Sequence, residues 1–221
     1  MTTFVYNIKM VLYFYGQYNS HGFLSNFYPA TFIITANIIG LSQEIKVNSA
    51  EKAIMWLKAL LMGDLNSASA IANESNPSIC KKHGRNVKPF DNAKWLDNRD
   101  KIALEVLTLK FQLPDFKKLL LETNLEILAE ASPTDKIWGI GISSAAALKG
   151  TPWNGENILG NTLMKVRSNL ILETTQTISQ THNDNEDDIP NVRKPFIRRV
   201  IIKSPISGCN TVRYETQYRN S

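Results

Sequence analysis

Two acidic residues from distant parts of the chain, Glu51 and Asp135, are the strongest candidates for acid–base chemistry. Asp135 follows Pro133 and precedes Gly139, so we expect a rigid turn to hold it. A positioned carboxyl group can donate or accept a proton in a reaction. Each residue also has a structural alternative, because an aspartate near proline often closes a turn and a glutamate near a helix start often acts as a cap.

Glu51 shares a helix face with a second reactive group, Lys58. A separation of seven residues brings Lys58 round to within roughly 20° of Glu51, about two helical turns away. A carboxylate and an amine therefore project from one side of this helix. In the structural alternative, Asn48 caps the helix and Glu51 occupies the third position, where it complements the helix dipole.

A third stretch, residues 81–99, alternates cations with aromatic residues. Arginine presents a planar fork that matches phosphate oxygens, and Trp95 offers a flat face for a heterocyclic ring. We expect Arg85 and Arg99 to be the phosphate-binding residues. The lysines of this stretch are expected to be solvated, namely Lys81, Lys82, Lys88 and Lys94.

The elements that position these residues are mostly helical. Apolar residues recur at helical intervals over 49–62, 65–73, 98–111, 116–129 and 156–170. Strand-like material is confined to residues 10–15 and to a hairpin formed by 30–39 and 43–47. The predicted fold class is α+β, predominantly α-helical, with a small N-terminal β-hairpin or sheet.

The net charge of +5 lies at the C-terminal end of the chain. Residues 189–221 hold seven Arg or Lys against one Glu, a balance of +6, which leaves about −1 for the first 188 residues. The polar stretch 174–188 is too poor in apolar residues to offset the entropy of ordering it. We therefore predict a domain at 1–173, an acidic linker at 174–188 and a basic tail at 189–221, which is either a solvated extension or a nucleic-acid contact.

The amino-acid composition restricts the class of protein, its compartment and its cofactors. With 43% hydrophobic residues the chain can bury a core, and its longest apolar run near the start is far below the roughly 20 residues of a membrane helix. Two cysteines cannot form a disulfide framework, so the cytoplasm is the expected compartment. The three histidines lack ligand spacing, and we expect neither a metal nor another cofactor.

Five motifs in a fixed order give this chain a clear resemblance to a known family. They are GFLSNFYP (22–29), SAEKA (49–53), HGR (83–85) with FDNAKW (90–95) and Arg99, EASPTDKIWGIG (130–141), and WNGENILG (153–160) leading into LMKVR (163–167). In order and type they resemble the NADAR family of YbiA-like N-glycosidases. The resemblance covers roughly residues 12 to 172.

The resemblance implies a YbiA-like fold and a hydrolase that cleaves a bond between a ribose anomeric carbon and nitrogen. It implies a small nucleotide-like substrate, most simply a phosphoribosylamino-pyrimidine intermediate of riboflavin synthesis. ADP-ribose attached to guanine in DNA is the alternative substrate, and a pocket that binds ADP-ribose or a nucleotide without cleavage is the alternative function.

The chemistry of such a cleavage suggests roles for individual residues as a physical hypothesis. Glu51 and Asp135 would act at the sugar, and Lys58 would offer a second route as an imine-forming nucleophile. The expected substrate-binding residues are Asn26, Phe27, Arg85, Trp95, Arg99 and Trp138.

Overall fold

The computed structural model describes residues 10–38, 41–183, 196–203 and 210–217. The described residues fall into two compact units. The first unit comprises the residues up to 34 together with 46–171, and the second comprises 35–45 and the residues from 172 onward. All the candidate site residues belong to the first unit.

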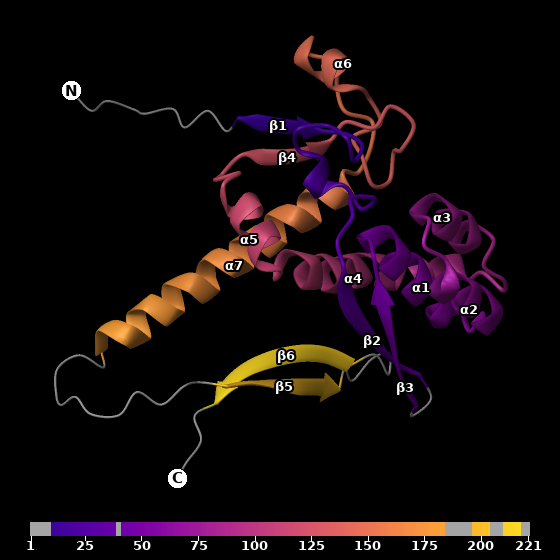
Figure 1. Cartoon of the computed structure of the whole chain (residues 1–221). Coiled ribbons are helices and arrows are strands. Elements are labelled where there is room, and N and C mark those ends of the chain that lie inside the picture. The colour runs from indigo at the N-terminus through magenta and orange to yellow at the C-terminus, as the bar shows by residue number, and fades with distance from the viewer. Residues whose placement is uncertain (1–9, 39–40, 184–195, 204–209, 218–221) are drawn as a thin grey trace, which may run out of the picture. The chain divides into compact units, whose positions relative to one another are not determined.

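Four helices form the centre of the first unit (Figure 1): α1 (Ala50–Met62), α2 (Leu65–Asn73), α3 (Pro77–Arg85) and α4 (Asn92–Phe111). Helix α1 packs against the other three and is buried on nearly all sides. Each helix begins at a polar cap whose side chain accepts a backbone N–H, and these caps are Ser49, Asp64, Asn76 and Asp91. The fixed helix starts determine which residues face the interior.

A parallel pair of strands forms the other part of this unit. Strand β1 (Val11–Phe14) pairs with β4 (Ile127–Glu130), and Phe14 lies opposite Glu130 in the register. Figure 1 shows the two strands side by side. Because the strands are parallel, their carboxyl ends meet at one edge, and the segments that leave both strands begin there.

A buried lysine fixes the segment between β1 and β2 (Phe32–Ile38). Lys110 on α4 donates from Nζ to the carbonyl oxygens of Phe23 at 2.7 Å and Ser25 at 2.8 Å. Burial lowers the pKa of Lys110 to about 7. The short 3-10 helix η1 (Gly22–Leu24) is thereby held against α4, which positions Asn26 beside the start of α1.

The remaining elements of the described chain complete the architecture. They are β3 (Leu41–Val47), which forms a two-stranded sheet with β2, α5 (Pro114–Leu121), α6 (Ser144–Leu148), α7 (Ile158–Asn183), and the antiparallel pair β5 (Phe196–Lys203) and β6 (Asn210–Gln217). The predicted fold class, predominantly helical with small sheets, is confirmed. None of the helices in the described ranges is long and apolar enough to cross a membrane.

Two sequence-based expectations differ from the structure. Residues 116–129 were expected as one helix, but α5 ends at Leu121 and Ile127–Glu130 form strand β4. Helix α7 continues to Asn183, into residues for which the sequence predicted a linker. Residues 184–188, the acidic end of that segment, lie outside the described residues.

Candidate active site

Glu51 lies in the first turn of α1 and is almost completely buried, with 4% of its surface exposed. Its backbone N–H donates to the carbonyl oxygen of Asn26 at 2.9 Å. Within the described part of the chain, its side-chain Oε1 has no hydrogen-bond partner. Burial raises the pKa of the Glu51 carboxyl to about 7, so near neutral pH it can both hold and release a proton.

The cap of α1 differs from the one expected in the structural interpretation of Glu51. Ser49, not Asn48, is the cap, and its side chain accepts the N–H of Lys52 at 3.2 Å. The polar contact that fixes the helix start therefore comes from Ser49. A buried carboxyl oxygen without a partner costs free energy, which a substrate contact can offset.

Three cations lie within electrostatic range of Glu51. Lys81 opposes the upward shift in the pKa of Glu51 most strongly, and Arg85 and Lys58 lower that pKa less. Lys81 and Arg85 are four residues apart on α3, so they share a face of that helix. The side of Glu51 toward α3 is thus electropositive.

Close packing at Gly84 brings α3 near α1, so that the charges of Lys81 and Arg85 lie within range of Glu51. A Cβ at Gly84 would collide with the Sδ of Met55, a buried residue of α1. Glycine therefore permits the two helices to approach at this point. The sequence gives no local sign of this contact, because Gly84 and Met55 lie on different helices.

Aromatic rings accompany two of the cations. The Nζ of Lys58 lies 4.6 Å from the ring centroid of Phe90 and 5.2 Å from that of Trp95. The Nζ of Lys81 lies 5.2 Å from the ring centroid of Phe27. Burial, followed by the charge of Arg85, lowers the pKa of Lys58, whereas Glu51 raises it. A cation held over aromatic rings is stabilised in its charged form, which works against the effect of burial.

A second carboxyl, Glu130, lies at the carboxyl end of β4; the residue is half-buried and its Oε2 is buried. Its pKa is raised to about 7, chiefly by burial and then by the charge of Asp135, while Lys81 lowers it and Glu51 adds a smaller upward shift. Within the described part of the chain its Oε2 has no hydrogen-bond partner. The structure therefore brings Glu51, Glu130, Asp135 and Lys81 into one electrostatic cluster.

Asp135 occupies the turn that the sequence predicted, and one of its oxygens holds that turn. Oδ1 accepts the backbone N–H of Ile137 at 3.0 Å and of Trp138 at 2.8 Å. The N–H of Asp135 donates to the Oγ of Ser132 at 3.2 Å. The turn-closing role is thus present, and it coexists with the charge of Asp135, which raises the pKa of Glu51.

The turn is anchored to β4 by close backbone approaches. A Cβ at Gly139 would lie 2.7 Å from the carbonyl oxygen of Glu130. The side chain of Asn157 bonds both the N–H of Glu130, at 3.1 Å, and the carbonyl oxygen of Leu128, at 2.9 Å. These contacts fix the spacing between Glu130 and Asp135.

The structure places the other expected substrate-binding residues in different surroundings. Asn26 is buried, and its Oδ1 has no hydrogen-bond partner within the described chain. Arg85 is exposed, and Trp138 is half-buried. Arg99 donates from Nη2 to Glu156 at 3.0 Å and from Nε to Asp100 at 3.1 Å, so its guanidinium is engaged in ion pairs.

Sequence reasoning missed two members of the cluster, Lys81 and Glu130. Lys81 was expected to be solvated, yet it is the strongest cationic neighbour of Glu51. A usable signal was its spacing of four from Arg85, which puts both on one helix face. Glu130 ends the apolar run ILAE, where a carboxylate at a strand end marks a position for chemistry.

Within the described ranges, no group of three or more His, Cys, Asp or Glu side chains is arranged to hold a metal ion.

Comparison with known proteins gives consistent matches across the first unit. A family model described as the NADAR domain matches residues 13–171. The chain is 43% identical over 122 residues to an N-glycosidase of Acanthamoeba polyphaga mimivirus, covering 54% of this chain and 72% of that protein. It is 30% identical over 168 residues to an N-glycosidase of Nostoc punctiforme, covering 73% of this chain and 93% of that protein.

A more distant relative and a solved structure extend these matches. A riboflavin biosynthesis protein of Vibrio vulnificus is 25% identical over 164 residues, which cover 74% of this chain and 39% of that protein. The NMR structure of the Escherichia coli protein YbiA superposes with a TM-score of 0.59 at 22% identity, covering 76% of this chain and 89% of that one. At that identity the likeness of the two structures concerns the fold alone.

Proposed function

Because the chain belongs to the NADAR family and is a hydrolase of N-glycosyl bonds, we propose that it cleaves the ribose C1′–N bond of a phosphoribosylamino-pyrimidine. One observation supports this proposal above the others. Among the described residues, Glu51 has a buried carboxyl oxygen without a hydrogen-bond partner, and it lies within electrostatic range of two further acids and three cations. This combination suits a phosphorylated sugar whose anomeric bond needs acid catalysis.

The acids would divide the chemistry of bond cleavage. As the C1′–N bond breaks, positive charge develops on the ribose ring and the leaving nitrogen demands a proton. Glu51, with a pKa of about 7, would protonate that nitrogen. Asp135, fixed by two backbone N–H groups, would stabilise the cationic sugar. The unpartnered oxygen of Glu130 would orient the attacking water.

The cations would bind the phosphate. Arg85 and Lys81 share one face of α3 on the electropositive side of Glu51. Arginine binds phosphate through two parallel N–H donors, and lysine adds a point charge. Arg99 is a weaker candidate for this role than sequence reasoning suggested, because Glu156 and Asp100 already hold its guanidinium.

The Vibrio vulnificus relative, a riboflavin biosynthesis protein, favours the pyrimidine substrate. The proposal is tested by incubating the full chain with a phosphoribosylamino-pyrimidine and, in parallel, with DNA that carries ADP-ribosylated guanine. Mass spectrometry then follows sugar release. We expect ribose 5-phosphate from the first substrate. Release of ADP-ribose from DNA with an inert pyrimidine substrate would overturn the proposed substrate and select the alternative.

Lys58 provides a second route that one trapping experiment separates from the first. Its neutral amine would displace the leaving amine at C1′ of the ring-opened sugar and form an imine, which water would hydrolyse. Burial lowers the pKa of Lys58, which favours its neutral amine, whereas the rings of Phe90 and Trp95 and the charge of Glu51 favour its ammonium form. Because two aromatic rings and an acid hold the ammonium form, we expect direct hydrolysis instead. Borohydride added during turnover should therefore leave the protein mass unchanged. A sugar adduct on Lys58 would establish the imine route.

A further inference from the structure

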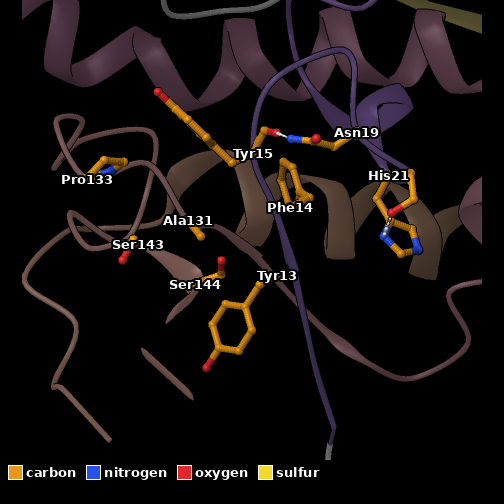
Figure 2. Close-up of a pocket in the computed structure, with 10 residues that line it drawn as sticks. Tyr13, Phe14, Tyr15, Asn19, His21, Ala131, Pro133, Ser143 and Ser144 are labelled. Atoms are coloured by element: carbon orange, nitrogen blue, oxygen red, sulfur yellow. Dashed lines mark hydrogen bonds between the residues drawn. The ribbon is translucent and has the colours of Figure 1, made fainter. Parts of the chain in front are cut away.

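A cavity of about 480 Å³ opens between the segment that follows β1 and the segment that follows β4. This volume is within the range of about 300–1,000 Å³ that small-molecule sites occupy. Figure 2 shows Ala131, Pro133, Ser143 and Ser144 on one side of the cavity, with Asn19 and His21 on the other. Both segments belong to the first unit.

The lining of the cavity is aromatic and polar but carries no Asp, Glu, Lys or Arg. Tyr13, Tyr15 and His21 supply rings, and Asn19 and Ser144 supply hydrogen-bonding groups. Tyr15 is well exposed, with 48% of its surface accessible. A lining of this kind fits a neutral, flat, polar ligand such as a nucleobase, and it offers nothing for a phosphate.

Two lining residues adjoin two of the acids along the chain. Ala131 directly follows Glu130, and Pro133 lies two residues before Asp135. Both lie beyond the carboxyl end of β4, and Tyr15 lies just beyond the carboxyl end of the parallel strand β1. Ligands of open α/β sheets bind in crevices at this edge of parallel strands.

The aromatic rings on the opposite, cationic side are partly occupied. One face of Phe90 and one of Trp95 meet the ammonium of Lys58, and one face of Phe27 meets that of Lys81. The cations and acids thus interact with one another, and the lining of the uncharged cavity continues the chain from Glu130. A phosphoribosyl substrate has a phosphate, an anomeric carbon and an uncharged ring, which require these three kinds of surroundings.

We propose that the cavity lined by Tyr13, Tyr15 and His21 binds the heterocycle that leaves when the glycosyl bond is cut. This assignment rests on the proposed function, and it gives the substrate a direction through the site. The heterocycle would stack on the tyrosine rings and exchange hydrogen bonds with Asn19 and Ser144. The sugar would remain beside Glu51, Glu130 and Asp135.

The test fills the cavity without touching the acids. Ser144 is exposed at the start of α6 and lines the cavity, so Ser144→Phe places a ring in it. Ala145→Phe adds the same ring at the next exposed position, which is not among the lining residues, and is the matched control. Tyr15→Ala removes a stacking surface from an exposed position and provides a second variant with little effect on folding.

Calorimetry would measure binding of the free aminopyrimidine and of ribose 5-phosphate to each protein. We expect Ser144→Phe and Tyr15→Ala to weaken aminopyrimidine binding about tenfold or more, since stacking and its loss are of that size. Ribose 5-phosphate binding should be unchanged, and Ala145→Phe should match the unmodified chain. Unaltered aminopyrimidine affinity in both cavity variants would overturn the proposal.

The same proteins separate this inference from the proposed function. Aminopyrimidine binding that is sensitive to Ser144→Phe in a chain that does not hydrolyse the phosphoribosylamino-pyrimidine would sustain the cavity and refute that substrate. Hydrolysis with an unchanged KM in Ser144→Phe would sustain the substrate and refute the cavity.

Discussion

Glu51→Gln should reduce kcat for hydrolysis of the C1′–N bond at least about a hundredfold, the lower end expected for loss of a positioned acid. Glutamine keeps the size of the side chain but holds no transferable proton. Glu51 is buried and its Oε1 has no partner in the described chain, so no neighbouring described group holds that oxygen in a structural role. We therefore expect the variant to fold and the loss to appear in turnover.

Stability gives an independent check on the same substitution. Burial raises the pKa of Glu51 from 4.5 to about 7, so the folded state binds the proton more tightly than the unfolded state. The resulting stabilisation is complete below pH 4.5 and is lost as pH rises toward 7. Relative to Glu51→Gln, the unmodified chain should lose unfolding free energy between pH 5 and pH 8. Loss of the carboxylate from the helix start costs at most about 1 kcal/mol in the other direction.

Glu122→Gln is the matched control for Glu51→Gln. Glu122 is exposed and follows α5, where its nearest charge is Lys118 at 4.0 Å. We expect this variant to keep the kcat of the unmodified chain. A folded Glu51→Gln variant with the same kcat as the control would remove Glu51 from the chemistry.

Asp135→Asn should likewise reduce kcat at least about a hundredfold, because it removes the negative charge that would stabilise the cationic sugar. In this structure the substitution removes the charge and leaves the hydrogen bonds of the turn in place. An asparagine oxygen can still accept the N–H groups of Ile137 and Trp138, so the turn should survive. Steady-state kinetics with a thermal unfolding midpoint for each protein would measure both effects.

Asp135→Ala distinguishes the structural role of Asp135 in the turn from the role of its charge. It removes the hydrogen-bond acceptor as well as the charge, so we expect it to lower the unfolding midpoint in addition to kcat. Asp115→Asn, in the exposed first turn of α5, is the control for a lost surface carboxylate. Near-normal turnover in a folded Asp135→Asn variant would leave Asp135 with the turn-closing role alone.

The spacing of apolar residues predicted the helices, whose hydrogen bonds join residues close in the sequence. The apolar periodicity of residues 49–62 predicted the helix that carries Glu51 and Lys58, and the structure has α1 at Ala50–Met62. The same method failed over 116–129, because Ile127–Glu130 pair with β1, more than a hundred residues earlier in the chain. Strand pairing of this range depends on tertiary contacts that a helical count does not detect.

The site was predictable where spacing alone relates the residues. The seven-residue separation of Glu51 and Lys58 correctly put both on one helix face, since Lys58 acts on the pKa of Glu51. Lys81 could not be predicted as a neighbour of Glu51, because its position depends on the contact of α3 with α1 at Gly84 and Met55. No interval in the sequence indicates that contact. The ion pair of Arg99 could not be predicted either, because its partner Glu156 lies 57 positions away in the sequence.

The pH dependence of kcat/KM, measured for the unmodified chain and for Glu51→Gln, tests most directly whether Glu51 donates the proton. Its pKa of about 7 means that the acid form is present below that pH and lost above it. We predict that log kcat/KM falls with a slope of −1 above about pH 7, and that this decrease is absent from the weak residual activity of Glu51→Gln. A decrease of unchanged position in Glu51→Gln would contradict this prediction, because another group, such as Glu130, would then be the acid.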